Sequence, residues 1–415
     1  MTTHMPVIPE NAEAAEATSP LEPGLSLVRG GALHRLFVRC RLAQEPIDLP
    51  GRRAIFVVLI TWLPMALLAL AAGRLFGGAG VPFLEHLAVH ARFLAALPLL
   101  IVAETFVHER IKPAVGGFSE RGLIAPQDQP RFDRAVASAV DLRDSVALEA
   151  IVLLLAFTGG YWVWTQTSLH VRSWYREIGS TSAGVGVSEI GGLMPAGYWY
   201  IFVALPIFHF ILFRWYFRLL IWYRFLWQVS RIPLRLNALH PDRAGGLGFL
   251  NASIIAFAPV LLAHTVFLSG VVADRIWHQG ERLPQFKLEL AGVCLVLILL
   301  VIVPLTFFVF QLESARRAAA REYGLVGMGY VNEFRDKWLA RRGSAQAESP
   351  LGSADIQSLA DLANSFEVVR EMSVVPFNRL AVLRLGFVLI LPLLPLTLTL
   401  MPLSDMFDRV VQMVL

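Results

Sequence analysis

Several ionisable residues lie inside otherwise apolar stretches of the sequence, where they are candidates for chemistry. Glu104, Glu149 and Arg214 each fall near one end of such a stretch. Arg218 and His108 follow Arg214 and Glu104 by one helical turn on the same helix face. If these stretches cross a membrane, a rise of about 1.5 Å per residue places all five residues in one layer near the inner interface.

This polar layer has two interpretations, and the sequence leaves both open. A structural layer of ion pairs would let the arginine stems lie in the membrane while their charged ends reach the cytoplasmic side. A coupling site would bind a proton or a substrate ion by changing which acid pairs with which base. Charges at the inner edge of a span are more often structural, above all Glu149, which lies nearest that edge.

His209 and His264 lie deeper, each near the middle of an apolar stretch. Matched histidines on neighbouring membrane helices can ligate a b-type haem, bind a metal ion or relay protons. Polar residues in membranes more often make one interhelical hydrogen bond each. Two histidines are a weak signal for haem, so we expect no cofactor.

A loop of unusual composition, HPDRAGGLGF, runs from residue 240 to residue 249. Its three glycines permit backbone angles that other residues resist, and Asn251 or Ser253 is placed to cap the helix that follows. A helix start offers unpaired N–H groups, so the loop could hold a phosphate, a carboxylate or a lipid head group. The candidate residues are His240, Asp242, Arg243, Gly245, Gly246 and Gly248.

The same loop has a structural interpretation, which the sequence favours. Asp242 would accept backbone N–H bonds in a tight turn, and Arg243 would pair with a nearby acid. A catalytic His–Asp pair is the least favoured alternative, because no serine or cysteine nucleophile accompanies it. We therefore assign no catalytic residue and favour a protein that is not an enzyme.

The elements that must position these residues follow from composition. The 415 residues are 56% hydrophobic and 16% charged, which is more apolar than soluble domains. The sequence predicts an all-α, polytopic transmembrane bundle of about seven spans, each needing about 20 apolar residues. The predicted spans cover residues 54–72, 87–107, 147–165, 197–217, 252–273, 288–312 and 380–401.

Arginine-rich segments precede span one and follow spans two, four and six, which predicts a cytoplasmic N-terminus. Their position beside apolar stretches argues against nucleic-acid binding, despite a pI near 9.3. Tryptophan, tyrosine and arginine alternate along residues 214–227, which predicts anchoring at head-group level and contact with anionic lipids. Cys40 and Cys294 are too differently placed to predict a disulfide, a zinc site or a redox motif.

The predicted organisation has four parts. Residues 1–28 form a disordered cytoplasmic tail without a signal peptide, and residues 29–312 form spans one to six with cytoplasmic helical loops. Residues 313–378 form a cytoplasmic helical segment, and residues 379–415 form the last span with a short outer helix. An apolar stripe in the third part needs a partner, most simply another helix of the chain: Ile356, Leu359, Leu362, Phe366, Val369 and Met372.

The loop sequence HPDRAGGLGFL, together with the later segment MSVVPFNR at residues 372–379, resembles an uncharacterised group of bacterial multi-pass membrane proteins. The resemblance covers most of the membrane part but not the N-terminal tail. It implies a fold class and the bacterial cytoplasmic (inner) membrane, and no activity.

Three functions remain open. The first is a transporter or permease of a small polar or anionic solute that uses the polar layer. The second is a membrane sensor, scaffold or assembly subunit, which would bind a partner subunit or a second copy of the chain through its cytoplasmic helices. The third is a haem- or metal-binding membrane protein that uses the deep histidines.

Overall fold

The structure is a computed structural model that describes residues 25–28, 30, 50–78, 80–167, 173–176, 193–340 and 354–399. Over these residues it is a bundle of helices without a named strand. Six helical stretches are long and apolar enough to cross a membrane, and they match every predicted span but the third. The third corresponds to an apolar helix that begins at Val146. Together these helices confirm the polytopic all-α bundle. The outer helix predicted near residue 405 lies outside the described residues.

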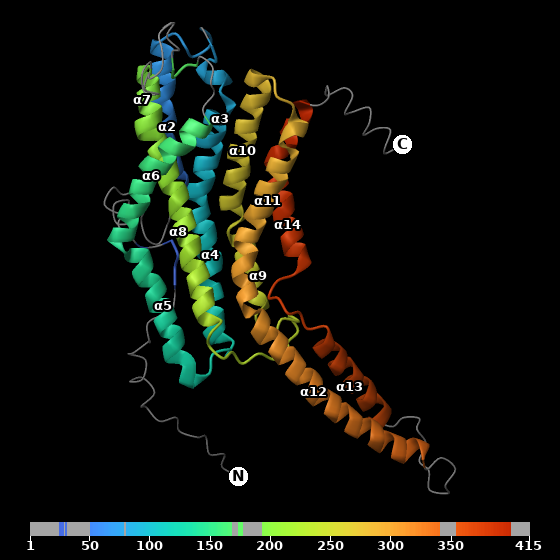
Figure 1. Cartoon of the computed structure of the whole chain (residues 1–415). Helices are drawn as coiled ribbons and strands as arrows, with labels where there is room; N and C mark the ends of the chain where they lie inside the picture. The colour runs from blue at the N-terminus through green and yellow to red at the C-terminus, as the bar shows by residue number, and fades with distance from the viewer. Residues whose placement is uncertain are drawn as a thin grey trace, which may run out of the picture.

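The spans are built from helices that are often interrupted. The elements are α2 (Pro50–Ala71), α3 (Leu87–His90), α4 (Leu97–Glu120), α5 (Gln129–Asp144), α6 (Val146–Thr167), α7 (Pro195–Trp199), α8 (Leu205–Val229), α9 (Asn251–Ala256), α10 (Ala258–Gln279), α11 (Lys287–Ile302), α12 (Val309–Phe334), α13 (Ala354–Arg370) and α14 (Arg379–Ile390). π-Helical turns join α3 to α4 and α7 to α8. Figure 1 shows most of these helices running lengthwise along one bundle, with α12 and α13 projecting from it.

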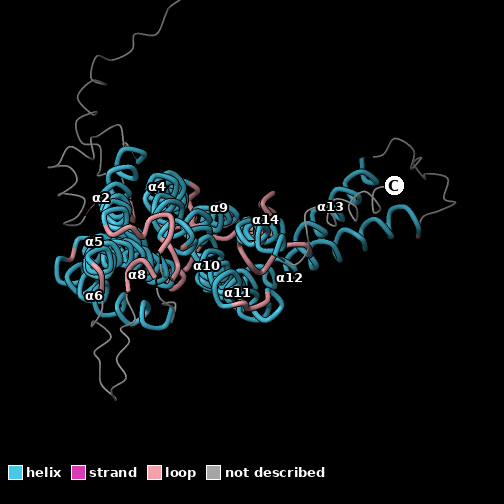
Figure 2. Tube along the Cα trace, turned by 90° about the horizontal axis from the view of Figure 1, so that it is seen from above, coloured by secondary structure: helices cyan, strands magenta, loops and turns pink. Residues whose placement is uncertain are grey.

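Two helices leave the bundle at one end and form a projecting arm, which comprises α12 and α13 (Figures 1 and 2). Within the arm, the Tyr330 hydroxyl donates to the Asp355 carbonyl at 2.9 Å, and Lys337 pairs with the Asp355 carboxylate at 2.7 Å. Helix α13 packs against α12. Val369 and Met372 of the predicted stripe are buried and its middle residues are partly buried, while Ile356 remains exposed, so most of the stripe is covered within the chain, as predicted. We call the end of the bundle that carries the arm the arm side.

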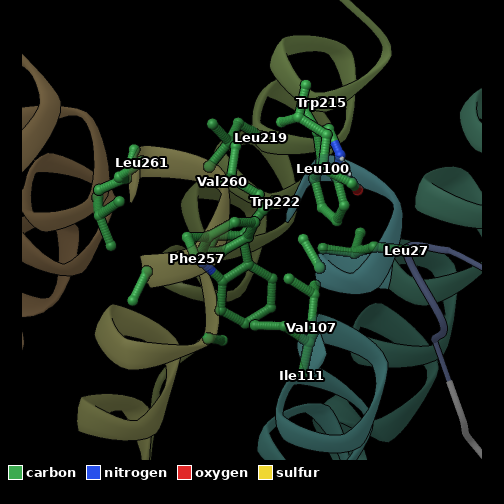
Figure 3. Close-up of a cluster of buried hydrophobic side chains, with 14 of the residues drawn as sticks. Leu27, Leu100, Val107, Ile111, Trp215, Leu219, Trp222, Phe257, Val260 and Leu261 are labelled. Atoms are coloured by element: carbon green, nitrogen blue, oxygen red, sulfur yellow. Dashed lines mark hydrogen bonds between the residues drawn. The ribbon is translucent and has the colours of Figure 1, made fainter. Parts of the chain in front are cut away.

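The first residues described correct one boundary of the prediction. Residues 25–28 were assigned to the disordered tail, but Leu25 and Leu27 are fully buried in the main core. Figure 3 shows Leu27 beside Val107 and Leu100 of α4. The packed core therefore includes residues that precede residue 29. Residues 1–24 lie outside the described part of the chain.

Aromatic side chains of α8 form the centre of the core rather than an anchor at head-group level. Trp215 and Trp222 are buried with Phe257 between α4, α8 and α10 (Figure 3). The Trp215 indole N–H donates to the Leu100 carbonyl at 2.9 Å, which satisfies its only polar group. Among the tryptophans of this run, Trp227 alone is exposed. The anchoring prediction was therefore wrong for Trp215 and Trp222, because their helix is surrounded by other helices.

The crossing of α10 over α3 requires a glycine. A Cβ atom on Gly270 would lie 2.5 Å from the Ala91 Cβ and 3.1 Å from the Leu87 carbonyl oxygen. The two backbones thus approach as closely as small residues allow, which is a common way for membrane helices to gain packing energy.

We expect Gly270→Ala to destabilise the bundle by about 1–3 kcal/mol, the usual cost of overpacking. The measurement is thermal unfolding of the detergent-purified protein. Gly292→Ala on α11 is the matched control, since nothing lies within 4 Å of its Cβ position. Equal melting temperatures for the two variants would contradict the tight crossing.

Candidate functional site

A buried ion-pair cluster surrounds Glu104 of α4. Arg53 of α2 donates a hydrogen bond to its carboxylate at 2.8 Å, and Arg218 of α8 donates another at 2.7 Å. Arg214 of α8 lies 4.0 Å from the same carboxylate. One carboxylate therefore joins three spans.

The structure brings together three of the predicted layer residues, Glu104, Arg214 and Arg218, and adds Arg53. The sequence indicated Arg53 only as one of the basic residues before span one. Because α2 already begins at Pro50, Arg53 lies in its first turn and only 3% of its side chain is exposed. Its neighbour Arg52 is exposed, so one of two adjacent arginines faces the core.

The other two predicted members lie at the edge of this cluster. Glu149 of α6 places a carboxylate oxygen 3.9 Å from the Nε of Arg214. His108 bonds through Nδ1 to the hydroxyl of Ser26 at 2.8 Å. Arg143 of α5 donates to the Ser26 carbonyl at 2.7 Å, so this short N-terminal segment covers the layer.

The space left inside the cluster is small. A cavity of about 20 Å³ is lined by Val57, Ile101 and Ile211 together with the charged groups of Arg53, Glu104, Arg214 and Arg218. That volume holds about one water molecule. The geometry favours the structural interpretation of the layer, in which each charged group lies beside one of opposite charge.

The two deep histidines point to different neighbours. His209 bonds through Nδ1 to the Leu205 carbonyl at 2.9 Å and packs against Gly160 of α6. His264 bonds through Nδ1 to the Val260 carbonyl at 2.7 Å and through Nε2 to the Tyr216 hydroxyl at 2.6 Å. His264 thus makes the expected interhelical hydrogen bond through Tyr216, whereas the bond of His209 goes to the carbonyl four residues earlier on its own helix. Among the described residues, no three His, Cys, Asp or Glu side chains gather as metal ligands would.

A second buried polar cluster lies at the opposite end of the bundle from the arm, and the sequence analysis missed it. Asp274 of α10 accepts hydrogen bonds from the backbone N–H groups of Leu87 and Ala88, both at 2.8 Å. Its carboxylate lies 3.2 Å from the Nε2 of His86, whose Nδ1 accepts from the Trp174 indole at 2.9 Å. Asp274 therefore closes the start of α3 and ties it to α10.

Arg92 lies one helical turn beyond this cluster, in the π-helical turn before α4. It is buried, donates to the Tyr200 hydroxyl at 2.6 Å and stacks on the Phe267 ring at 4.5 Å. Tyr200 begins the other π-helical turn, so one hydrogen bond links the two irregular turns. There was little indication of this cluster in the sequence, because Asp274 lies one residue past the predicted fifth span. Arg92, an arginine within the predicted second span, was the signal that could have revealed it.

On the arm side, the backbone N–H groups of the 240–248 loop bind a carboxylate of the loop itself, that of Asp242. The carboxylate of Asp242 accepts backbone N–H bonds from Ala244 at 2.8 Å, Gly246 at 3.1 Å and Gly248 at 2.8 Å. His240 lies 2.9 Å from the same carboxylate. The donors that the sequence offered to an external anion are already used, as in the structural interpretation.

Burial alone would raise the pKa of Asp242. Backbone hydrogen bonds from Ala244, Gly248 and Gly246, together with nearby His240, outweigh that effect and hold the pKa below its ordinary value of 3.8. The carboxylate is therefore charged in the folded protein at neutral pH.

The predicted helix caps after this loop are absent, and Asn251 has another role. Neither Asn251 nor Ser253 caps α9, which begins without a side-chain cap. The Ser253 hydroxyl donates to the Leu250 carbonyl. The Asn251 side-chain oxygen instead accepts from the backbone N–H of Asn378 at 3.3 Å, which ties the loop to the start of α14.

The second motif of the sequence, residues 372–379, lies directly beside the loop. The Ser373 N–H donates to the Arg243 carbonyl at 2.6 Å, and Arg243 pairs with Glu371 at 2.7 Å. Arg243 has a φ of 53°, a left-handed conformation that is rare for a non-glycine residue. Gly245, beside the Met372 side chain, has a φ of 65°, a left-handed conformation that favours glycine where the two segments touch.

A pocket of about 990 Å³ opens between these two segments. Its polar lining includes Arg379, Asn378 and Ser373, and its apolar lining includes Phe377 and Leu383. This volume is at the upper end of the range found for small-molecule sites. Two motifs that are far apart in the sequence thus form one pocket at the base of the spans α9 and α14.

The acidic side chains of this pocket have partners within the protein, but one of its basic side chains has none among the described residues. Its acids, Asp242 and Glu371, are committed to the loop N–H groups and to Arg243. Arg379 is exposed and has no ion-pair partner in the part of the chain that the structure describes. It also lies in the first turn of α14, whose start carries a partial positive charge. The pocket therefore offers uncommitted positive charge to a ligand.

Comparison of the chain with protein-family models, with curated proteins and with solved structures finds no match.

We expect Glu104→Gln to destabilise the protein by about 3–5 kcal/mol, because it leaves two buried arginines without their shared counter-ion. The measurement is the unfolding free energy in denaturant, with Glu109→Gln as control. Glu109 lies on the same helix but is exposed. A loss no larger than that of the control would contradict the ion-pair cluster as a structural element.

We expect Asp242→Asn to cost about 1–3 kcal/mol at neutral pH, because three N–H donors keep only a weaker acceptor. A carboxyl whose folded pKa is lowered stabilises the protein above its unfolded pKa and loses that contribution as the pH falls through the folded value. The difference in melting temperature between wild type and variant should therefore narrow below pH 3.8. A difference that is independent of pH would contradict this role.

Proposed function

We propose that this multi-pass membrane protein is a transporter or permease of an anionic solute, which it first binds in the pocket between residues 240–248 and 371–383. The observation that carries the proposal is the uncommitted positive charge of Arg379 in a pocket whose acids are already paired. The positive-inside pattern favours a cytoplasmic position for the pocket, in a bacterial inner membrane.

Both segments that line the pocket lead directly into membrane helices. Residues 240–250 continue into α9, and Asn378 caps α14 by accepting the Ala381 N–H at 2.8 Å. An anion at this cap would interact with the positive end of the α14 dipole and with Arg379. A ligand in the pocket would thus contact two spans at once.

The spans next to the pocket contain points at which they can bend. Phe257 and Pro259 mark the interruption between α9 and α10, and a 3₁₀ segment containing Pro304 separates α11 from α12. Proline removes a backbone hydrogen bond, so these positions resist bending less than a continuous helix does. The cavity inside the bundle, beside Glu104, holds about one water molecule. Passage of a larger solute through the bundle therefore requires bending of the spans.

The binding step is tested by thermal stability with inorganic phosphate, glycerol 3-phosphate or acetate added. We expect at least one of these anions to raise the melting temperature of the wild type, since a ligand of the folded state stabilises it by mass action. The Arg379→Gln variant should lose this shift. Arg370→Gln is the control, because Arg370 is exposed on α13 and does not line the pocket.

Flux of the stabilising anion into proteoliposomes separates transport from binding alone. The proposal expects uptake by wild type and by the Arg370 variant, and little uptake by the Arg379 variant. Binding without uptake would leave the pocket as a sensor site and contradict the transporter.

A second function, an assembly or scaffold role, is favoured by the arm. Its helix α12 exposes Leu325 and Met328 by 70% and 63% on the side away from α13. The residues of the α13 stripe, in contrast, are largely occupied by packing on α12. Changing Leu325 and Met328 to Asp should therefore alter the assembly state in size-exclusion chromatography with light scattering if the arm binds a second copy, and an unchanged mass would contradict that role.

A further inference from the structure

The side of α14 that continues from the pocket is apolar and faces away from the bundle. Leu380, Leu383 and Phe387 follow one another at helical spacing and are each more than half exposed. Leu383 is 69% exposed and also lines the pocket. Because α14 belongs to a stretch that is long and apolar enough to cross a membrane, we expect this surface to contact lipid chains. The pocket is thus open to the bilayer as well as to water.

A second arginine lies on the same exposed side. Arg384 is exposed and follows Leu380 by four residues, so it shares the stripe with Leu383 and Phe387. It lies about 7.5 Å further along the helix than Arg379 and about 140° around it, at about 1.5 Å and about 100° per residue, with Leu383 between the two. No described acid pairs with either arginine. Two cations therefore flank the apolar residue at which the pocket meets the lipid.

We infer that the ligand of the pocket is an anionic membrane lipid. This inference rests on the proposed binding function. Its phosphate lies between Arg379 and Arg384 at the start of α14, and its chains follow Leu383 and Phe387. The rest of the head group occupies the pocket beside Ser373 and Asn378.

The size and lining of the pocket favour a lipid over a small soluble anion. Its volume of about 990 Å³ far exceeds what a single phosphate fills, and Val375, Phe377 and Val382 give it apolar walls. A soluble anion would leave these walls and the exposed leucine in contact with water or bilayer, with no gain from them. An amphiphile uses the charged end and the apolar walls together.

The choice of an anionic lipid over a neutral one follows from the charges. A zwitterionic head group brings its own cation close to Arg379 and Arg384, which have no described acid to offset it. An anionic head group supplies one net negative charge to the two guanidinium groups, which bind phosphate oxygens with several donors each. The head groups of phosphatidylglycerol and phosphatidylcholine differ in this respect and make a direct comparison.

The test compares lipids and a soluble head-group analogue on detergent-purified full-length protein. Phosphatidylglycerol, phosphatidylcholine and glycerol 3-phosphate are titrated separately, and binding is followed by native mass spectrometry and by melting temperature. We expect phosphatidylglycerol to bind at least tenfold more tightly than either of the others. Arg379→Gln and Arg384→Gln should each weaken its binding about tenfold, the loss of one charge-assisted contact.

Leu383→Ala and Leu391→Ala form a matched pair for the lipid chains. Both leucines are exposed in the same span, but Leu391 does not line the pocket. We expect Leu383→Ala to weaken phosphatidylglycerol binding severalfold and to leave glycerol 3-phosphate unaffected, while Leu391→Ala changes neither. Equal melting temperatures of the two variants without ligand show that both are folded.

The outcomes separate the inference from the proposed function. If glycerol 3-phosphate binds as tightly as phosphatidylglycerol and Leu383→Ala has no effect, the pocket takes a soluble anion; the inference is overturned and the anion site stands. If phosphatidylcholine binds equally well, the anionic lipid is wrong. If Arg379→Gln changes the binding of no anion, both the site and the inference fail.

Discussion

The bundle depends on one shared carboxylate, that of Glu104. Two arginines on different helices donate to it, and a third lies 4.0 Å away, so α2, α4 and α8 meet at a single charge. Such a group is costly to place in a membrane and is stable only when its partners are in position. Correct assembly of these spans therefore satisfies the charge, and incorrect assembly leaves it unpaired.

Two other carboxylates act in the same way at the two ends of the bundle. Asp274 closes the N–H groups at the start of α3 and so joins it to α10. On the arm side, the Asp242 carboxylate accepts hydrogen bonds from backbone N–H groups of the glycine loop. These bonds fix the conformation of the loop, and the neighbouring pocket stays open. Because Asp242 and Glu371 are used internally, Arg379 in the pocket and Arg384 further along α14, neither of which has a described ion-pair partner, are candidates for an external ligand.

Much of this arrangement follows from the sequence, and the exceptions have physical reasons. Apolar length predicts the spans, and the one-turn spacing of Arg214 and Arg218 predicts a common partner. The burial of Arg53 could not be predicted, since α2 is apolar on every side and gives no periodicity that orients it. The pocket could not be predicted either, because it depends on a contact between residues 243 and 373, which are far apart in the chain.

We propose that the two distant segments form one ligand pocket at the membrane edge. Hydrogen–deuterium exchange of the protein in nanodiscs, with phosphatidylglycerol or with phosphatidylcholine, tests it most directly. We predict that residues 240–250 and 371–383 gain protection together in phosphatidylglycerol, while the arm exchanges at the same rate in both lipids. Protection of only one segment, or of neither, would contradict a shared pocket.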